Sequence, residues 1–267
     1  MTDPDRRAGD PADGGGSAGA AAGGVTARND DEAPDHRGAV TRMFEGVARR
    51  YDLLNRLLSA GQDRRWRRRA VALLSPDARR VLDVAAGTGD LASAFLAARP
   101  GGEAAACDPA PAMATHAARK LAGRAGWRGV VLGAAESLPF AGASFDAAMA
   151  AFGARNFADL AGGLAEMARV VRPGGELLVL EFFPAEKPLV AGLFRFYFRR
   201  VLPAVGGLVS GDRAAYRYLP ASVDEFLDRA AFTELLARQG LVDIRKVELT
   251  GGIATAFHAS KPVANMV

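Results

Sequence analysis

The stretch RVLDVAAGTGDL, residues 80–91, decides the fold of this chain. Its first part, VLDV at 81–84, is a short apolar run typical of a strand buried on both faces of a parallel sheet. Gly87 and Gly89 follow in a tight turn, where the missing Cβ atoms let the backbone pass close to a ligand. A helical pattern, LASAFLAA, then runs up to Pro100. A strand, a glycine turn and a helix in this order predict a cradle for a nucleotide cofactor.

Two acids near the turn favour one cofactor over another. The turn also fits the GxGxxA form of a dinucleotide fingerprint, so the glycines alone do not decide. Asp83 lies just before them, where a carboxylate attracts the cationic methionine moiety of S-adenosylmethionine and repels a pyrophosphate. A second strand is expected at 104–108, and its last residue, Asp108, can accept hydrogen bonds from both hydroxyls of a ribose. Both acids favour S-adenosylmethionine, with an NAD-linked oxidoreductase as an alternative.

Strand and helix patterns alternate along the rest of the chain. Helices are expected at 111–121, at 160–171 (ended by RPGG) and at 223–238 (with Ser222 as N-cap), and strands at 130–132, 144–152 and 176–181. Two further strands, 244–249 and 255–259, flank Gly251-Gly252 and predict a closing antiparallel hairpin. This alternation predicts a doubly wound, mostly parallel α/β sheet with helices on both faces. The ligand site is then expected beyond the carboxyl ends of the strands.

The flanks of this core differ from it in composition. Residues 1–38 are rich in Gly, Ala, Asp and Pro, so we expect a disordered tail, followed by one domain at 39–267. Residues 39–74 are expected to form a helical cap, which precedes the first strand and is therefore free to cover the open edge of the sheet. The apolar and aromatic segment 190–222 is expected to be a lid over a hydrophobic acceptor, with a core-packing helix as the alternative.

The composition excludes several classes of protein. The chain has 267 residues, 49% of them apolar, which is enough for one full core. The single cysteine, Cys107, excludes a disulfide scaffold and is expected to be a buried, inert thiol. No apolar run of about eighteen residues and no signal-peptide core occurs, which indicates a cytoplasmic protein. No metal site is expected, and the oligomeric state stays open.

An arginine cluster at 64–69 accounts for much of the local positive charge. Only Tyr51 and Trp66 lie near it, whereas nucleic-acid binding needs basic residues interleaved with stacking aromatics. We therefore expect no nucleic-acid partner and a solvated arginine face. Contact with anionic headgroups at the inner membrane surface is a second interpretation.

Several motifs together resemble one known family. They are MFEGVARRYDLLNRLLSAGQDRRW (43–66), LDVAAGTGD (82–90), AESLPF (135–140), SFD (144–146), FGARNFAD (152–159), RVVRPGGELLVLEF (169–182) and AYRYLPAS (215–222). From about residue 41 to 261, the chain resembles the ubiquinone/menaquinone biosynthesis C-methyltransferases, the type that includes demethylmenaquinone methyltransferase. The cofactor loop is generic to class I methyltransferases, whereas FGARN, AYRYLPAS and YDLLN are specific. The resemblance implies a class I S-adenosylmethionine-dependent methyltransferase with a seven-stranded sheet and an N-terminal helical lid.

The resemblance also implies cofactor-binding positions. Thr88 and Asp108 match the family's glycine-loop and ribose-binding positions. Ala134 and Ala135 match the loop that flanks the adenine, where the first position is often asparagine. Ala151 matches a position that often carries a cofactor-contacting serine. Because alanine lacks the amide group, a contact at Ala134 must come from the backbone, and Ala151 lacks the hydroxyl that the serine supplies.

The implied reaction is methyl transfer to a ring carbon of a reduced, lipophilic quinone. Arg155 is expected to stabilise the phenolate that develops on the acceptor, and Asn156 to orient its ring. Tyr51 and Asn55 are expected to close the site from the cap. Demethylmenaquinol is the first choice of acceptor and 2-polyprenyl-6-methoxy-1,4-benzoquinol the second. A class I methyltransferase acting on oxygen or nitrogen of another molecule, and a protein that only binds the cofactor, are the remaining alternatives.

Overall fold

The computed structural model describes residues 56, 59, 61–184, 192 and 222–263. The expected tail at 1–38, most of the cap at 39–74 and nearly all of the lid at 190–222 lie outside the described residues. The expected division of the chain into tail, cap and lid therefore stays a prediction.

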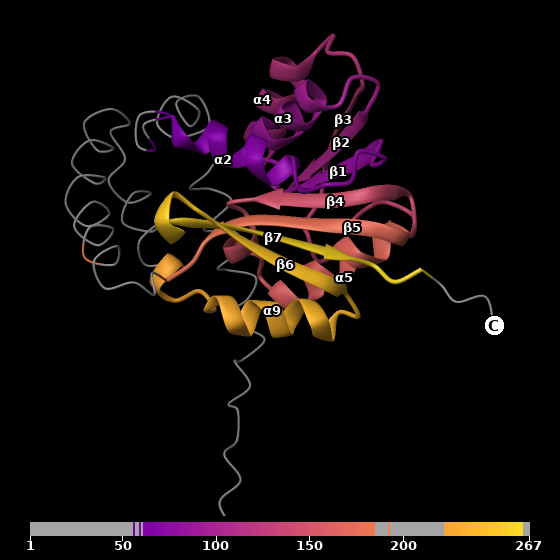
Figure 1. The fold of residues 1–267 in the computed structure, drawn as a ribbon. Helices are drawn as coiled ribbons and strands as arrows, with labels where there is room; N and C mark the ends of the chain where they lie inside the picture. Colours follow the sequence, from indigo (N-terminus) through magenta and orange to yellow (C-terminus); the bar gives the residue numbers. More distant parts are fainter. Residues whose placement is uncertain (1–55, 57–58, 60, 185–191, 193–221, 264–267) are drawn as a thin grey trace, which may run out of the picture.

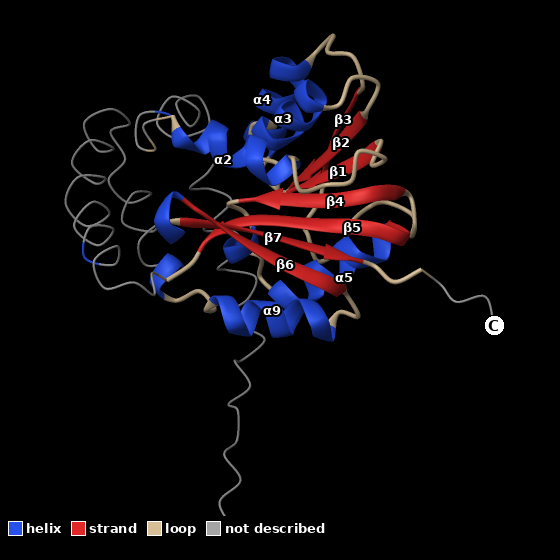
Figure 2. Cartoon of the chain, viewed as in Figure 1, coloured by secondary structure: helices blue, strands red, loops and turns tan. Residues whose placement is uncertain are grey.

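Within these residues, seven strands form one mixed sheet (Figure 2). The strands are β1 (Arg80–Val84), β2 (Glu103–Asp108), β3 (Trp127–Leu132), β4 (Phe145–Ala151), β5 (Val171–Phe182), β6 (Val242–Leu249) and β7 (Ala254–Ser260). Their spatial order is β3-β2-β1-β4-β5-β7-β6. Strands β1 to β5 pair in parallel, and β7 is antiparallel to both β5 and β6. The expected mostly parallel α/β sheet and its closing antiparallel hairpin are confirmed.

Helices cover both faces of the sheet (Figure 1). They are α2 (Gln62–Val71), α3 (Asp90–Ala98), α4 (Pro111–Leu121), α5 (Leu160–Val170) and α9 (Arg229–Arg238), with 3-10 turns η1 (Ala154–Asn156) and η3 (Thr250–Gly252). One apolar core lies between the sheet and α2, α3 and the end of α4, and a second lies between the sheet, α5 and α9. The strand order reverses between β1 and β4, and ligands of such sheets bind beyond the carboxyl ends of the strands at this point.

Helix α2 packs on a face of the sheet. Trp66 is 5% exposed, and its ring lies 5.9 Å from that of Phe182 in β5. Its Nε1 donates a hydrogen bond to Oγ1 of Thr250 at 2.8 Å. Val71 is buried in the same core as Phe95 of α3. The expectation that this part of the cap covers the open edge of the sheet is wrong, because the apolar stripe of α2 is buried against α3 and β5.

Strand β5 begins earlier than predicted, because the RPGG segment is part of it. Val171 pairs with Phe145 of β4, and the register between the two strands shifts just after this pair. Gly175 permits the close approach, since a Cβ there would lie 2.5 Å from the carbonyl oxygen of Asp146. The glycines therefore mark an irregularity inside the strand and not a loop in front of it.

Helix α9 begins at Arg229, so the prediction of a helix from 223 with Ser222 as N-cap is wrong. Ser222 lies in a separate helical turn at 222–224. The side chain of Asp228 accepts a hydrogen bond from the backbone N–H of Ala231 at 2.8 Å. Aspartate is among the strongest N-cap residues, and here it sets the start of the helix.

Cys107 is buried, as predicted, at 1% exposure. Burial raises the pKa of its thiol to about 12. The thiol is therefore protonated at neutral pH, which supports the prediction that it is inert.

A buried arginine anchors α9 to the sheet. Arg229 is 2% exposed and donates hydrogen bonds to Oγ1 of Thr255 at 3.0 Å, to the carbonyl of Pro184 at 2.9 Å and to the carbonyl of Gly252 at 2.7 Å. Its guanidinium also lies over the ring of Phe183. These contacts join the end of β5, the β6–β7 turn and α9 at one point.

Replacing this anchor should destabilise the protein. Arg229→Met is expected to lower the free energy of unfolding by about 3 kcal/mol, because three buried acceptors lose their donor. The thermal midpoint should then fall by roughly 6–12 °C. Arg238→Met is the matched control on the same helix, where the side chain is 74% exposed. Equal midpoints for the two variants in thermal unfolding would contradict the role of Arg229.

Candidate active site

A cavity lies at the carboxyl ends of β1, β2 and β4, where the strand order reverses. Residues from the glycine turn, the end of β2, the loop at 134–136 and the segment 151–158 line it. It brings together these predicted site residues: Gly87, Thr88, Asp108, Ala134, Ala135, Ala151 and Asn156. The predicted residues that do not line it are Asp83, Gly89 and Arg155. Tyr51 and Asn55 lie outside the described residues.

Asp83 is a buried acid with a free acceptor. It is 1% exposed, and its Oδ2 accepts a hydrogen bond from the backbone N–H of Ala92 at 2.8 Å. In the part of the chain that the structure describes, Oδ1 has no hydrogen-bond partner. Burial raises the pKa of this carboxyl to about 7, against the opposing effects of the Ala92 hydrogen bond and the Arg67 charge. The carboxylate is therefore short of the positive charge that would stabilise it.

Asp108 faces the cavity with both oxygens fixed by the backbone. Its Oδ2 accepts from the N–H of Gly87 at 2.7 Å, and its Oδ1 accepts from the N–H of Ala110 at 2.9 Å. Burial raises the pKa of Asp108, and these two hydrogen bonds oppose that shift. Each carboxylate oxygen can accept a further hydrogen bond, so the geometry suits a diol.

The two glycines of the turn have different roles. Gly87 has φ +55°, and a Cβ built there would meet nothing within 4 Å. Gly89 has φ +78°, and its Cβ would lie 2.9 Å from Cδ1 of Leu121 and 3.3 Å from Cβ of Ala117. Both of these contacts come from α4. Gly87 therefore leaves room on the cavity side, whereas Gly89 is needed for packing of α3 against α4, which corrects the expectation that it approaches a ligand.

Strained backbone lies on two sides of the cavity. Ala85, after β1, has φ 51°, and Phe152, after β4, has φ 59°. Both residues line the cavity. The two segments approach closely, because a Cβ on Gly153, the residue after Phe152, would lie 2.8 Å from Cβ of Ala85. Such strain persists only where the surroundings fix it, and it is frequent at functional sites.

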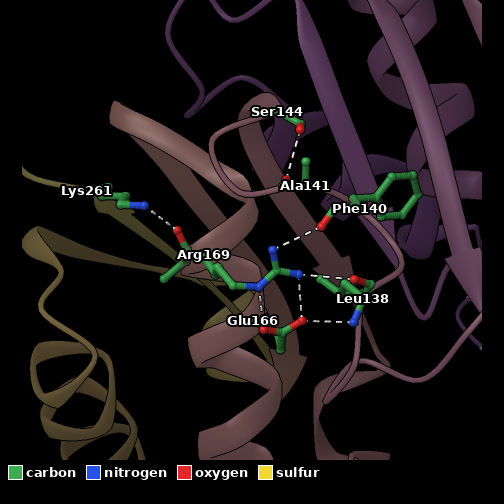
Figure 3. A network of polar contacts seen from close by, with 8 residues as sticks. Leu138, Phe140, Ala141, Ser144, Glu166, Arg169 and Lys261 are labelled. Atoms are coloured by element: carbon green, nitrogen blue, oxygen red, sulfur yellow. Dashed lines mark hydrogen bonds and ion pairs between the residues drawn. The ribbon is translucent and has the colours of Figure 1, made fainter.

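The loop at 134–140 is held from outside the cavity by α5 (Figure 3). Glu166 accepts a hydrogen bond from the N–H of Leu138 at 2.9 Å. Arg169 donates to the carbonyls of Leu138 at 3.1 Å and Phe140 at 3.0 Å, and pairs with Glu166. This pairing lowers the pKa of Glu166. On the cavity side, Glu136 accepts from the N–H of Ala158 at 2.6 Å. The AESLPF motif thus forms a loop that is fixed at both ends.

Arg155 is committed to a buried ion pair. Its Nη1 lies 2.5 Å from Oε1 of Glu181, and the two side chains are 5% and 0% exposed. It also donates to the carbonyl of Phe152 at 2.9 Å and to Oγ of Ser222 at 3.2 Å. This arrangement therefore does not favour the expected direct contact between Arg155 and the methyl acceptor. Its neighbour Asn156 lines the cavity instead.

Phe152 and Arg67 are among the residues of the cavity wall that were not predicted. Phe152 stacks on Phe182 with ring centroids 4.5 Å apart. Arg67 lines the cavity and is 6% exposed, so the expectation of a solvated arginine face is wrong at this position. The spacing of Trp66, Ala70 and Val71 marks the buried stripe of α2 and could have shown that Arg67 lies on it.

The chain matches a known family over most of its length. The model described as the ubiE/COQ5 methyltransferase family matches residues 30–261. The chain belongs to this family. A ubiE/COQ5 relative from Syntrophotalea carbinolica, named ubiquinone/menaquinone biosynthesis C-methyltransferase UbiE, is 48% identical over 216 residues, which cover 80% of this chain and 91% of the relative. The demethylmenaquinone methyltransferase of Thermus thermophilus is 47% identical over 221 residues, which cover 82% of this chain and all of the relative (100%).

Solved structures agree with the fold of this ubiE/COQ5 methyltransferase. A chain of the complex between the Haloferax volcanii Trm112 methyltransferase activator and a methyltransferase has a TM-score of 0.58 at 17% identity, covering 82% of this chain and 97% of that one. A SAM-dependent methyltransferase from Thermotoga maritima has a TM-score of 0.57 at 20% identity, with coverages of 82% and 99%. The sheet is thus that of the class I methyltransferases, as expected.

Proposed function

We propose that this methyltransferase transfers a methyl group from S-adenosylmethionine to a ring carbon of demethylmenaquinol. Its membership of the ubiE/COQ5 family supports the reaction class. Relatives named demethylmenaquinone methyltransferase, at 46% and 47% identity, support the acceptor. Since other relatives of similar identity carry the joint ubiquinone/menaquinone name, the corresponding benzoquinol is the second candidate acceptor.

The observation that carries the choice of cofactor is the arrangement of two buried acids around the glycine turn. Asp83 has an unpartnered oxygen and needs a cation, and the ammonium group of the cofactor is one. Asp108 faces the cavity with geometry suited to the ribose hydroxyls. Gly87 leaves open the space that a Cβ would fill. These features fit S-adenosylmethionine, whereas a pyrophosphate would add negative charge beside two carboxyls.

The chain contributes positioning and exclusion of water to the reaction. S-adenosylmethionine supplies a methyl group on a positively charged sulfur and so needs little further activation. The walls made by Phe152 and Phe157 keep the cavity largely apolar, which suits an aromatic acceptor. Asn156 is proposed to donate a hydrogen bond to the acceptor oxygen on which charge develops. Tyr51 and Asn55 are proposed to complete the site from the cap.

Arg155 is proposed to act as a positioning residue. Its guanidinium joins the carbonyl of Phe152, Glu181 near the end of β5, and Ser222. It thereby fixes η1, which carries Asn156. The charge of Arg155 is balanced by Glu181, so its effect on the acceptor passes through the position of Asn156.

The acceptor is lipophilic, and a peripheral contact with the inner membrane surface is proposed for its delivery. Among the helices that the structure describes, none is both long enough and apolar enough to cross a bilayer. The segment at 190–222 is the proposed lid, and its role stays a prediction.

A product assay tests the proposed reaction. Purified protein is incubated anaerobically with S-adenosylmethionine and either demethylmenaquinol or 2-polyprenyl-6-methoxy-1,4-benzoquinol, and the products are identified by mass spectrometry. We expect one added methyl group on a ring carbon of demethylmenaquinol. A methylated benzoquinol alone would move the assignment to the second acceptor. Methylation at oxygen, or no methylated product with either quinol, would contradict the proposal.

Replacing Asp108 should weaken binding of the adenosine part of the cofactor. Asp108→Asn is expected to weaken both S-adenosylhomocysteine and methylthioadenosine by roughly 30-fold in calorimetry, because both carry the ribose. The matched control is Asp146→Asn, since Asp146 also accepts two backbone N–H groups but lies at the amino end of β4. Unchanged affinity in Asp108→Asn would remove Asp108 from the ribose site.

A further inference from the structure

One arginine of the cluster at 64–69 differs from the others. Arg67 is 6% exposed and lines the cavity, whereas the other four arginines of the cluster are exposed. Burying an arginine is costly unless its hydrogen bonds and its charge are satisfied. Its position therefore requires a reason that packing alone does not give.

The contacts of Arg67 hold it in place without using all of its donors. Its Nη1 lies 2.9 Å from Oδ2 of Asp63, one turn earlier on α2. Asp63 is itself fixed, because its Oδ1 accepts from Oγ of Ser59 at 2.9 Å. The guanidinium lies 5.2 Å from the ring centroid of Phe152, which also lines the cavity. In the described part of the molecule, Nε of Arg67 has no hydrogen-bond partner.

An unpartnered acceptor lies within electrostatic reach of Arg67, although its side chain does not itself line the cavity. Oδ1 of Asp83 is buried without a hydrogen-bond partner in the described ranges. Arg67 is close enough for its charge to act on Asp83, yet no hydrogen bond joins the two side chains. A cationic donor and an anionic acceptor, both buried and both incompletely bonded, match the two poles of an amino-acid zwitterion.

We propose that Arg67 binds the α-carboxylate of the methionine part of the cofactor, while Asp83 binds the neighbouring ammonium group. Asp63 is the positioning residue that holds the guanidinium toward the cavity. The assignment of Arg67 rests on the proposed use of S-adenosylmethionine. It gives a function to the SAGQD segment, residues 59–63, which supplies the Ser59–Asp63 support at the start of α2.

Truncated ligands separate this role from a general effect on the fold. Binding to wild type and Arg67→Met is measured by calorimetry with three probes: S-adenosylmethionine, decarboxylated S-adenosylmethionine and methylthioadenosine. The variant should weaken S-adenosylmethionine roughly 30-fold, as for the loss of a charge-assisted hydrogen bond, and the two probes without a carboxylate less than about 3-fold. Arg68→Met, at an exposed neighbouring position, is the control and should leave all three affinities unchanged.

The outcomes distinguish the role of Arg67 in binding the carboxylate from the choice of cofactor. An equal loss for all three probes, or no loss for any, would overturn the assignment of Arg67. If circular dichroism shows that Arg67→Met does not fold, Asp63→Asn replaces it. A loss of affinity that is selective for S-adenosylmethionine, the probe with a carboxylate, supports the assignment of Arg67. An equal loss of affinity for all three probes overturns it. Failure of S-adenosylmethionine to bind the wild type would instead contradict the proposed function.

Discussion

Asp83→Asn is expected to weaken binding of S-adenosylhomocysteine by roughly 30- to 100-fold and, at the same time, to stabilise the free protein at pH 8. The loss of affinity follows because the neutral amide cannot form an ion pair with the ammonium group. The hydrogen bond from Ala92 can be kept by the amide oxygen, so the fold should survive. A variant that binds worse but melts higher would show that the acid is retained for binding and not for stability.

The sign of the stability effect follows from the pKa of Asp83. Its pKa in the folded protein is about 7, above the ordinary value of 3.8. The stability associated with the protonated form is complete below pH 3.8 and is lost as the pH rises through 7. The charges facing this carboxyl are Arg67 from α2, Asp90 from α3 and Asp108 from β2. At pH 8 the folded protein holds a buried anion, and the asparagine removes it.

The measurement is thermal unfolding of the ligand-free proteins at pH 5 and pH 8, together with calorimetry. The thermal midpoint of Asp83→Asn should exceed that of wild type by about 5 °C or more at pH 8, with a smaller difference at pH 5. Methylthioadenosine, which lacks the ammonium, should bind both proteins equally. Unchanged affinity for S-adenosylhomocysteine, or a lower midpoint at pH 8, would show that Asp83 is a structural acid.

Arg155→Met is the second variant with a large expected effect, a fall in turnover of about 100-fold. Loss of the guanidinium releases η1 and the neighbouring Asn156, and displacement of a substrate-orienting group by about 1 Å can cost this much. The change also leaves Glu181 buried without its partner, so the free energy of unfolding should fall by about 3 kcal/mol. Turnover and thermal unfolding measure the two effects.

A double variant separates the two effects. Arg155→Met/Glu181→Gln removes the unpaired charge but keeps a hydrogen-bond acceptor at position 181. In the wild-type protein, Oε1 of Glu181 accepts a hydrogen bond from the backbone N–H of Phe182 at 2.8 Å. Most of the lost stability should return, while kcat stays low and the affinity for S-adenosylhomocysteine remains within about 3-fold of wild type. If turnover recovers together with stability, Arg155 serves the fold alone.

The fold could be predicted well at several elements whose ends are marked by glycine or proline. Helix α4 has the predicted bounds, because Pro111 begins it and Gly123 follows shortly after Leu121. The predictions failed where two local signals competed. At β5 the glycines allow an irregular strand, which looks like a loop in sequence. At α9 both Ser222 and Asp228 are good caps, and sequence alone does not show which one the chain uses.

The site was predictable only in part, for a related reason. The carboxyl ends of parallel strands meet at one edge, so Gly87, Asp108 and Ala134 could be placed together from topology alone. Arg155 could not be placed, because its partner Glu181 is 26 residues away in the chain. Arg67 is one of five arginines at 64–69, and only the helical spacing of the apolar residues near it distinguishes this buried arginine from the exposed ones.

The claim that the buried acid at the glycine turn binds the ammonium group of the cofactor is tested most directly by measuring proton release on binding. S-adenosylhomocysteine is titrated into the wild-type protein between pH 5.5 and 7.5, in buffers of different ionisation enthalpy. With the pKa of Asp83 at about 7 in the free protein, affinity should rise by about 20-fold across this range, and about half a proton should leave at pH 7. Methylthioadenosine should show neither effect. Binding of S-adenosylhomocysteine that is independent of pH and exchanges no proton would contradict the account.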